Sequence, residues 1–409
     1  MFFNKKFRKW GGKMERIKFS IFISVFVSFL GLTVIMPVLS PLIRELNLSE
    51  SHAGWIVSIG SIAMAAAGPL WGVWSDKRGR KPIMLIGLLG LFVSYALFTG
   101  IVYLGLRHLL SGGLLLGGLI AARFLIGIFI PSVPPTAQAY MADVTQNQDR
   151  SSGMSLISAA NGLGLVLGPA LAGAFALAGL IWPLYLGTFL PLVAFTIVLV
   201  IIPKAKPLTR DKPPKVHPFQ KNVRLYLFIG LTTMIGIITI QSISGFYLQD
   251  KLMLSTNEMA RSLAIGLTCS GIAMLFIQIV QMKWLKWEPN TMIMSGGFLV
   301  ILSMLCLLIS NSLFIYYLAF FLFGIGVGLM MPGFMTGASL AVSNEQQGAV
   351  AGLVAAVQGI AAIITPVLTT SLYELNQSIP YTLVIVVVFI ALCSVAAQKY
   401  VSREKAPLS

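Results

Sequence analysis

One short segment of the chain concentrates ionisable groups between two long apolar runs. Residues 72–82 hold one acid and four cations: Asp76, Lys77, Arg78, Arg80 and Lys81. Each such charge would cost on the order of several kcal/mol in hydrocarbon, so the segment must be a turn at a membrane surface. Gly79 permits the positive φ that a tight turn needs. Gly72 is expected to let its helix approach a neighbour closely. The segment therefore predicts an interfacial turn built for ion pairing.

Arg123 is the second candidate for chemistry, because it falls inside an apolar run. It stands about three helical turns into that run, since a turn takes about 3.6 residues. A charge at that depth must face protein or a water-filled cavity, and it marks a functional site by default. We therefore expect Arg123 to act in coupling or substrate binding. Snorkelling of its side chain to an interface is the alternative.

The thirteen acids are informative because none lies deep within an apolar run. A buried Arg123 without a buried carboxylate makes a cavity neutral to positive. This predicts neutral, zwitterionic or anionic substrates rather than permanent cations. The three histidines are scattered over loops and a linker, so no metal site is expected. No Ser-His-acid set appears, which argues against a membrane-embedded enzyme, and no cofactor is expected.

Twelve apolar runs of about 20 residues must position these groups. The chain is 57% hydrophobic and only 10% charged, which excludes an ordinary soluble domain. The runs lie near residues 17–41, 52–75, 83–104, 112–141, 150–176, 180–202, 222–249, 259–282, 290–310, 313–340, 346–372 and 378–399. The predicted fold is an all-α polytopic membrane protein. Its predicted parts are an N-terminal six-helix bundle (1–202), a proline-rich cytoplasmic linker (203–221) and a C-terminal six-helix bundle (222–409).

The distribution of cations predicts the orientation in the membrane. With both termini inside, cytoplasmic segments hold 24 of the 29 Lys and Arg residues and external loops hold 4. The positive-inside rule then places both termini in the cytoplasm. The net charge of +16 is explained in this way, without a nucleic-acid partner. The expected location is the cytoplasmic (inner) membrane, with the lipid bilayer as partner and the chain as a monomer.

The two halves look like diverged copies of one another. An offset of 197 residues aligns the following pairs: Gly127 with Gly324, Pro135 with Pro332, Asn161 with Gln358, Gly162 with Gly359, and Pro169 with Pro366. Parallel repeats related by an axis along the membrane normal are a transporter architecture. The repeat predicts two pseudo-symmetric bundles, with a substrate site near the membrane midplane between them.

The fifth run carries a glycine pattern that predicts close helix packing. Gly164 and Gly168 form a small-xxx-small face. Pro169 follows at once and should bend the helix, and Gly173 lies one turn later. An ordinary close-packed helix pair would explain the glycines equally well. The first run contains a further candidate kink, Gly31-Leu-Thr-Val-Ile-Met-Pro37.

These motifs resemble those of the major facilitator superfamily, in its 12-span drug:proton antiporter subgroup. The turn is similar to the Gly-x-x-x-Asp-x-x-Gly-Arg-Lys loop after the second helix of that family. Arg123 and Gly127 match a fourth-helix motif linked to proton coupling. The fifth run matches the antiporter signature, except that Ala172 stands where the family usually has glycine.

The resemblance also implies a cytoplasmic latch that favours the outward-open state. Arg80 would pair with Asp143, and Asp76 would face the N-terminus of the eleventh span, which opens with the predicted capping box Ser343-Asn-Glu-Gln346. The corresponding loop of the second half, Lys283–Pro289, has lost the pattern, so the latch would be one-sided.

Polar side chains within the runs are candidates for a substrate cavity. They are Gln138, Asn161, Gln241, Tyr247 and Gln358, with Tyr140 and Gln278 as further possibilities. Each could instead make a hydrogen bond between helices, because amides in apolar helices need partners. An adaptable apolar wall could come from Phe246, Met330 and Met331.

The leading hypothesis is a proton-coupled secondary transporter that exports small amphipathic molecules by alternating access. Its expected partners are a small-molecule substrate and protons. One alternative is export of a particular anionic metabolite, such as a polycarboxylate siderophore, and another is an uptake carrier. A channel is disfavoured by the twofold repeat with its Gly-Pro kinks.

Overall fold

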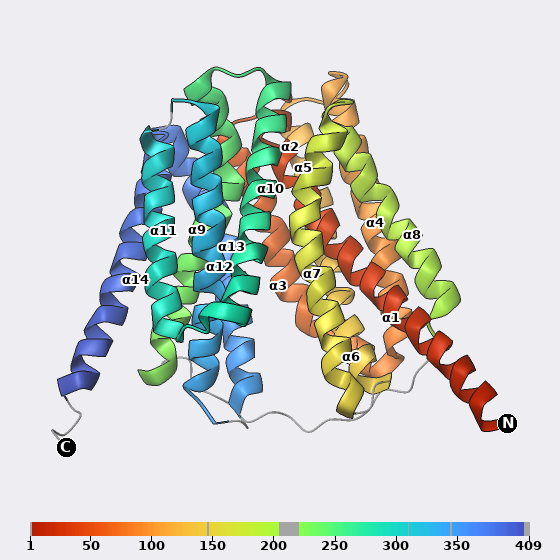
Figure 1. Cartoon of the computed structure of the whole chain (residues 1–409). Helices are drawn as coiled ribbons and strands as arrows, with labels where there is room; N and C mark the ends of the chain where they lie inside the picture. Colours follow the sequence, from red (N-terminus) through yellow and green to blue (C-terminus); the bar gives the residue numbers. More distant parts are fainter. Residues whose placement is uncertain (1, 145–146, 204–220, 310, 344–345, 405–409) are drawn as a thin grey trace. The chain divides into compact units, whose positions relative to one another are not determined.

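The computed structural model describes residues 2–144, 147–203, 221–309, 311–343 and 346–404 (Figure 1). Within these ranges the regular structure is helical and contains no strand. The first half comprises α1 (Phe2–Val34), α2 (Met36–Glu45), α3 (Glu50–Arg78), α4 (Arg80–Leu106), α5 (Gly112–Phe129), the short η1 (Ile130–Ser132), α6 (Pro134–Val144), α7 (Asn147–Ala176) and α8 (Trp182–Ile201).

The second half has the same general plan. It comprises α9 (Lys221–Leu252), α10 (Thr256–Val280), the π-helical turn η2 (Gln281–Leu285), α11 (Pro289–Ile309), α12 (Leu313–Leu340), α13 (Gln347–Leu375) and α14 (Ile379–Glu404). The predicted capping box at the start of the eleventh span includes residues 344–345, which lie outside the described residues.

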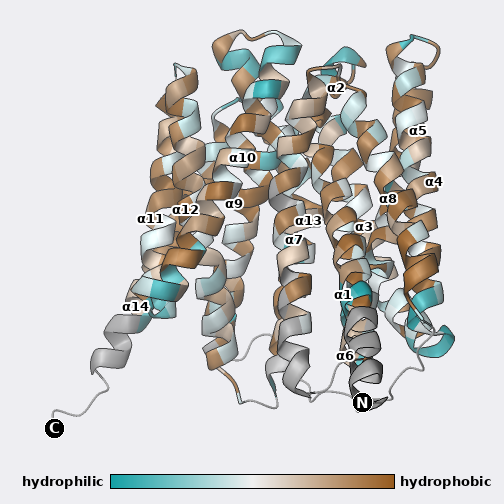
Figure 2. Ribbon diagram, turned by 45° about the vertical axis from the view of Figure 1, so that its right-hand side comes forward, coloured by the Kyte–Doolittle hydropathy of each residue, from teal (hydrophilic) through white to brown (hydrophobic). Residues whose placement is uncertain are grey.

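Twelve segments of the described chain are long and apolar enough to cross a membrane, as the sequence predicts. Each is helical because hydrocarbon offers no partner for backbone N–H and C=O groups, which must therefore bond within the segment. Hydrophobic residues run along the lengths of the helices, and hydrophilic residues gather toward their ends (Figure 2). The predicted all-α, twelve-span fold is thus confirmed.

Proline interrupts two of the spans. The first consists of α1 and α2, which meet at Ile35, with Pro37 in the first turn of α2. The fourth consists of α5, η1 and α6, with Pro131 in η1 and Pro134 at the start of α6. Proline lacks the N–H that would continue the helical ladder. The kink expected at Gly31–Pro37 is therefore a real break.

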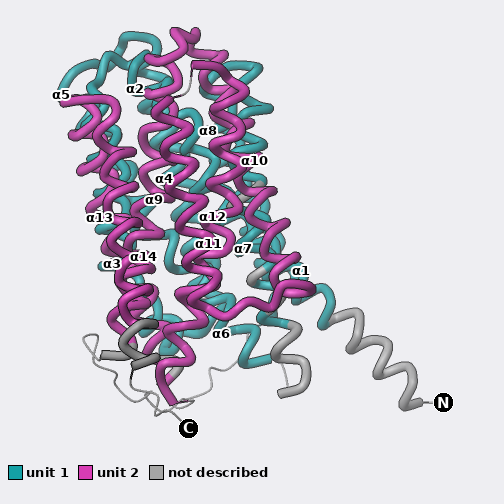
Figure 3. The backbone as a smooth tube through the Cα atoms, turned by 60° about the vertical axis from the view of Figure 1, so that its left-hand side comes forward, with its two compact units in different colours: residues 1–210 teal, residues 211–409 magenta. Residues whose placement is uncertain are grey.

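The chain divides into two compact units, residues 1–210 and 211–409 (Figure 3). In the first unit, α1 packs on α7, α3 on α5 and α4 on α8; in the second, α9 packs on α13, α10 on α12 and α11 on α12. The division falls in the segment predicted as a linker, of which residues 204–220 lie outside the described residues. We refer to the two units as the N-terminal and the C-terminal bundle.

Candidate functional site

Arg123 lies at a close crossing of α3 and α5 in the N-terminal bundle. A Cβ added to Gly127 would overlap the carbonyl oxygen of Gly60, so only glycine allows the two backbones to come this near. One turn before Gly127, the stem of Arg123 occupies the space beside Gly60, whose missing Cβ would lie 3.0 Å from the Arg123 Cγ. The two glycines therefore fix where the Arg123 side chain can go.

The Arg123 side chain is buried in this bundle with its hydrogen-bonding capacity unfilled. The residue is 4% exposed, and its Nη1 has no hydrogen-bond partner among the described residues. The phenol of Tyr95, on α4, is equally buried and also lacks a partner there. The two groups interact electrostatically. A buried charge without a fixed protein partner is costly, so this pair needs water, an anion or a polar substrate atom.

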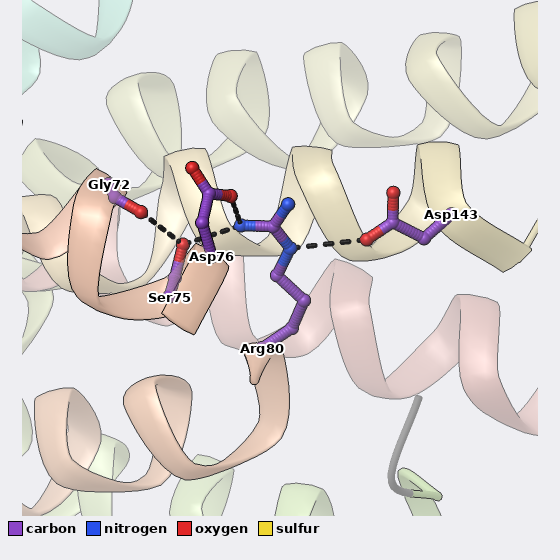
Figure 4. A network of polar contacts seen from close by, with 5 residues as sticks. All are labelled: Gly72, Ser75, Asp76, Arg80 and Asp143. Carbon is purple, nitrogen blue, oxygen red and sulfur yellow. Dashed lines mark hydrogen bonds and ion pairs between the residues drawn. The ribbon is translucent and has the colours of Figure 1, made fainter. Parts of the chain in front are cut away.

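Arg80 is the centre of a second polar cluster, at the turn between α3 and α4 (Figure 4). Its Nε donates to Asp143 Oδ2 at 3.1 Å. Its Nη1 donates to Ser75 Oγ at 2.6 Å and also contacts Asp76 Oδ1. The guanidinium thus lies between two carboxylates from α3 and α6. The pairing of Arg80 with Asp143 that the family resemblance implied is present.

Burial differs sharply between the two acids that bind Arg80. The side chains of Arg80 and Asp143 are 7% and 2% exposed, whereas that of Asp76 is 64% exposed. Exposed ion pairs contribute roughly 0–1 kcal/mol, but breaking a buried pair costs about 3–5 kcal/mol. Most of the energetic importance of the cluster therefore belongs to Asp143.

The turn itself is held from several sides. Gly79 has φ +96°, a conformation that favours glycine, so the predicted role of this residue is met. Lys81 Nζ donates to the carbonyl of Leu199 on α8 at 2.8 Å. Trp71 Nε1 donates to the carbonyl of Ile128 on α5 at 2.6 Å. These contacts fix the turn against neighbouring helices.

The glycines of α7 pack against α1. A Cβ at Gly164 would lie 2.9 Å from the carbonyl oxygen of Phe26, and one at Gly168 would overlap the Thr33 hydroxyl. Thr33 Oγ1 donates to the carbonyl of Gly164 at 3.0 Å and so joins the two helices. Pro169 is buried within α7, and Gly173 is buried one turn later.

Comparison with known proteins decides the family. The sequence model described as Major Facilitator Superfamily matches residues 21–366 and, again, 291–409. The chain belongs to the major facilitator superfamily. It is therefore a multi-pass membrane transporter rather than an enzyme.

Characterised members of the superfamily match over most of their length. The chain is 24% identical over 376 residues to "Multidrug resistance protein 2" of Bacillus subtilis (strain 168), covering 88% of this chain and 89% of the relative. It is 24% identical over 375 residues to "Quinolone resistance protein NorA" of Staphylococcus aureus (strain MSSA476), covering 90% and 92%. These relatives are named for drug resistance.

Solved structures agree on the fold. A bacterial homologue of the human lysosomal transporter Spinster, inward-facing and occupied, matches with a TM-score of 0.72 and 15% identity, covering 95% of this chain and 97% of that one. A mutant form of the nucleoside transporter NupG matches with a TM-score of 0.76 and 12% identity, covering 93% and 99%. At such identities the likeness concerns the major facilitator fold alone.

Several candidate cavity residues of this major facilitator chain are placed differently from expectation. Tyr247 is 1% exposed, and its hydroxyl donates to the carbonyl of Leu307 at 3.0 Å. Tyr140 is equally buried and donates to the carbonyl of Pro203 at 3.1 Å. Both tyrosines thus make the hydrogen bonds between segments that were the alternative interpretation, and they offer no surface to a substrate in this conformation. Phe246 and Met330, expected in an apolar wall, are fully buried within the C-terminal bundle.

The polar amides remain candidates. Gln138 is exposed, and Asn161, Gln241 and Gln358 are half-buried. The buried Asn161 Oδ1 has no hydrogen-bond partner among the described residues. Their role as substrate contacts stays a prediction.

Gly72 does not have the packing role expected of it. No described atom of its own bundle lies within 4 Å of the position that a Cβ would take. Its carbonyl instead accepts from Ser75 Oγ at 2.9 Å. Because Ser75 in turn accepts from Arg80, Gly72 contributes to the Arg80 cluster through its backbone.

Two participants were missed from the sequence. Ser75 stands five residues before Arg80, a spacing that could have suggested contact across the turn. Tyr95 is a tyrosine well inside an apolar run, which could have marked it as a polar group in need of a partner. Ser75 occupies an unspecified position of the turn motif, and Tyr95 lies outside the motifs.

Proposed function

We propose that this transporter is a proton-driven exporter of small amphipathic molecules, working by alternating access in the cytoplasmic (inner) membrane with both termini inside. The single observation that carries the proposal is the buried guanidinium of Arg123, whose Nη1 has no partner in the described structure. A side chain in that state is available to bind water, a proton-carrying group or a substrate atom as the transporter cycles.

The names of the relatives support small amphipathic drugs as the substrate class. Proteins named for multidrug and quinolone resistance match along about nine-tenths of the chain. Such names point to drugs as substrates, and small amphipathic molecules are the class that we propose. The half-buried amides Asn161, Gln241 and Gln358 would supply adaptable hydrogen bonds to such compounds.

The distribution of charged residues along the spans narrows the class of expected substrates. In the described spans, every carboxylate stands in the first or last turn of its span, whereas Arg123 lies in the interior. Two unit charges of like sign repel more strongly at low dielectric than in water. Permanent cations are therefore disfavoured beside Arg123, and neutral, zwitterionic or anionic molecules are favoured.

Coupling to protons would involve two places in the N-terminal bundle. At the first, Arg123 and Tyr95 would hold the water that relays a proton, because Arg123 Nη1 and the Tyr95 hydroxyl have no hydrogen-bond partner among the described residues. At the second, the Arg80 cluster would act as a conformational latch, with Asp143 and Asp76 as the acids that hold or release Arg80. No cofactor is required, since the proton gradient is the energy source.

Transport by the purified full chain in proteoliposomes tests the proposal. Transporters whose cytoplasmic face points outward should carry a zwitterionic fluoroquinolone into liposomes with an acidic lumen. Dissipation of the pH gradient should stop this accumulation. Ethidium, a permanent cation, should be transported poorly. Arg123→Ala should strongly reduce accumulation, while Arg107→Ala, which removes an exposed cation from the α4–α5 loop, should not. Gradient-independent accumulation, or efficient ethidium transport, would contradict the proposal.

A second candidate is export of a specific anionic metabolite, such as a polycarboxylate siderophore. The unpartnered cation Arg123 favours it, because a carboxylate could complete that group's hydrogen bonds. Counterflow in proteoliposomes loaded with a tricarboxylate would support this candidate if fluoroquinolones failed to compete. Substrate accumulation only under the reverse gradient would indicate uptake instead of export.

A further inference from the structure

The segment from Gln281 to Trp287 forms a fixed turn between two membrane spans. Gln281, the first residue of the turn, makes two hydrogen bonds to its last residues. The backbone N–H of Lys286 donates to the carbonyl of Gln281 at 2.9 Å, and Gln281 Nε2 donates to the carbonyl of Trp287 at 3.2 Å. Lys286 adopts a left-handed conformation, with φ +48° and ψ +37°. The turn therefore has a defined shape rather than that of a loose linker.

The turn presents apolar and cationic side chains outward together. Trp284 and Met282 are 71% and 69% exposed, and Trp287 is 36% exposed. Lys283 and Lys286 are both exposed, and neither makes an ion pair within the described part of the chain. One acid, Glu288, follows and is also exposed. Tryptophan with lysine at the end of a span is suited to the level of lipid headgroups.

The equivalent turn of the N-terminal bundle uses its cations differently. There Arg80 binds Asp143, Lys81 binds the Leu199 carbonyl, and the Arg78 guanidinium lies 5.6 Å from the centre of the Trp74 ring. Those three groups have partners inside their own bundle. Lys283 and Lys286 have none among the described residues of theirs, so both ammonium groups are open to an external anion.

We propose that the turn of Gln281–Trp287 binds the headgroup of an anionic phospholipid. The preceding span ends at Leu285, inside the turn, and the next span begins at Pro289, so the turn is expected at the membrane surface. The two ammonium groups attract the lipid phosphate, while Trp284 and Met282 lie against the acyl–headgroup boundary. The expected cytoplasmic side of this turn is the leaflet whose negative surface potential attracts lysine. The lipid would anchor the ends of α10 and α11.

Hydrogen–deuterium exchange of the full chain in nanodiscs tests this site directly. Amide exchange in peptides covering the turn should slow as phosphatidylglycerol replaces phosphatidylcholine. In Lys283→Gln/Lys286→Gln the phosphatidylglycerol content needed for half the protection should rise about 30-fold, or saturation should not be reached, because each lysine near an anionic surface contributes about fivefold. Lys283→Arg/Lys286→Arg, which keeps the charges, should behave as the native chain does.

A matched control removes two cations elsewhere. Arg107 and Arg261 lie in the α4–α5 loop and the first turns of α10, so Arg107→Gln/Arg261→Gln loses the same charge away from the turn. This variant should leave the protection unchanged. The proposal is overturned if the two lysine-to-glutamine changes leave the protection intact, if the control loses it equally, or if phosphatidylcholine alone gives full protection. Because both lysines are exposed, thermal unfolding of the double variant should match that of the native chain.

Discussion

The N-terminal and C-terminal bundles share one helix crossing and differ in what they place beside it. Gly127 meets the carbonyl of Gly60 where α5 crosses α3, and Gly324 meets the carbonyl of Ser270 where α12 crosses α10. The offset of 197 residues that relates these glycines also relates Arg123 to Phe320. One repeat therefore puts a guanidinium where the other puts an aromatic ring.

The surroundings of Arg123 and Phe320 also differ in how well their neighbours are packed and hydrogen-bonded. Phe320 is fully buried, packs against Gly266 and lies 4.7 Å, ring to ring, from Tyr316. The hydroxyl of Tyr316 donates to the carbonyl of Ser244 at 3.1 Å. Arg123 Nη1 and the Tyr95 hydroxyl instead have no hydrogen-bond partner in the part of the chain that the structure describes. The shared crossing thus holds a packed aromatic ring in the C-terminal bundle and an unpartnered guanidinium in the described part of the N-terminal one.

The comparison predicts opposite effects on stability and transport at the equivalent positions Phe320 and Arg123. These are the largest effects expected of any single substitution. Phe320→Ala should destabilise the protein by about 3–5 kcal/mol, because it empties a packed aromatic site. Arg123→Ala should leave stability unchanged or raised, since it removes a buried charge without a fixed partner, yet reduce gradient-driven transport about 10- to 100-fold. Thermal unfolding and proteoliposome transport, measured on both variants, separate the two effects.

Equal loss of stability in both variants would contradict the distinction between scaffold and function. Arg123→Lys is an informative companion, because it keeps the charge but not the planar donor geometry. Intermediate transport with native stability is expected of it.

The second prediction concerns the Arg80 cluster, which has no counterpart in the described turn of the C-terminal bundle. Asp143→Ala should cost about 3 kcal/mol, the lower end of the range for breaking a buried pair, because Ser75 and Asp76 still contact Arg80. The measurement is the shift in thermal unfolding of the purified chain. Glu288→Ala, which removes an exposed acid from the corresponding turn, should change stability by less than about 0.5 kcal/mol. Similar shifts in the two variants would mean that the cluster is not a stabilising element.

A structural feature could be predicted from the sequence where a strong physical constraint determines it. The twelve spans were predictable because hydrocarbon enforces both length and helicity. The break near Pro37 followed from the missing N–H of proline. The φ of Gly79 followed from the tight turn, and the Arg80–Asp143 pair from the family resemblance. These features depend little on how helices are rotated about their axes.

What the sequence left open concerns the rotation of helices about their axes, which one sequence does not reveal. Polarity alone could not tell that the Tyr247 hydroxyl meets the Leu307 carbonyl rather than a cavity. Gly72 has the same residue type as Gly127, yet only Gly127 faces a neighbouring backbone in its bundle. Tyr95 was missed because its relation to Arg123 exists only once α4 and α5 are packed.

The third prediction tests whether the crossing is equally tight in both repeats. Gly127→Ala and Gly324→Ala should each destabilise the protein by about 1–3 kcal/mol, because each added methyl group meets a backbone carbonyl. Gly117→Ala and Gly352→Ala serve as controls within α5 and α13, where no described atom lies within 4 Å of the new carbon. Those changes should be neutral or slightly stabilising, since alanine favours helix more than glycine does. A loss confined to one bundle would show that the crossing is not shared energetically.

Within the Arg80 cluster, the smallest stability effect is expected at Asp76, its exposed acid. Asp76→Asn should alter the free energy of unfolding by less than about 1 kcal/mol, because the side chain is 64% exposed and its ion pair is screened by water. If the cluster acts as a conformational latch, transport should nevertheless fall several-fold, since a latch needs differential stability between states rather than total stability. Thermal unfolding and initial transport rates of Asp76→Asn and Asp143→Asn, compared side by side, provide the measurement. If transport falls only in proportion to stability in both variants, the cluster stabilises the fold and does not act as a latch. The contrast with the turn at Lys283–Pro289 would then concern folding rather than transport.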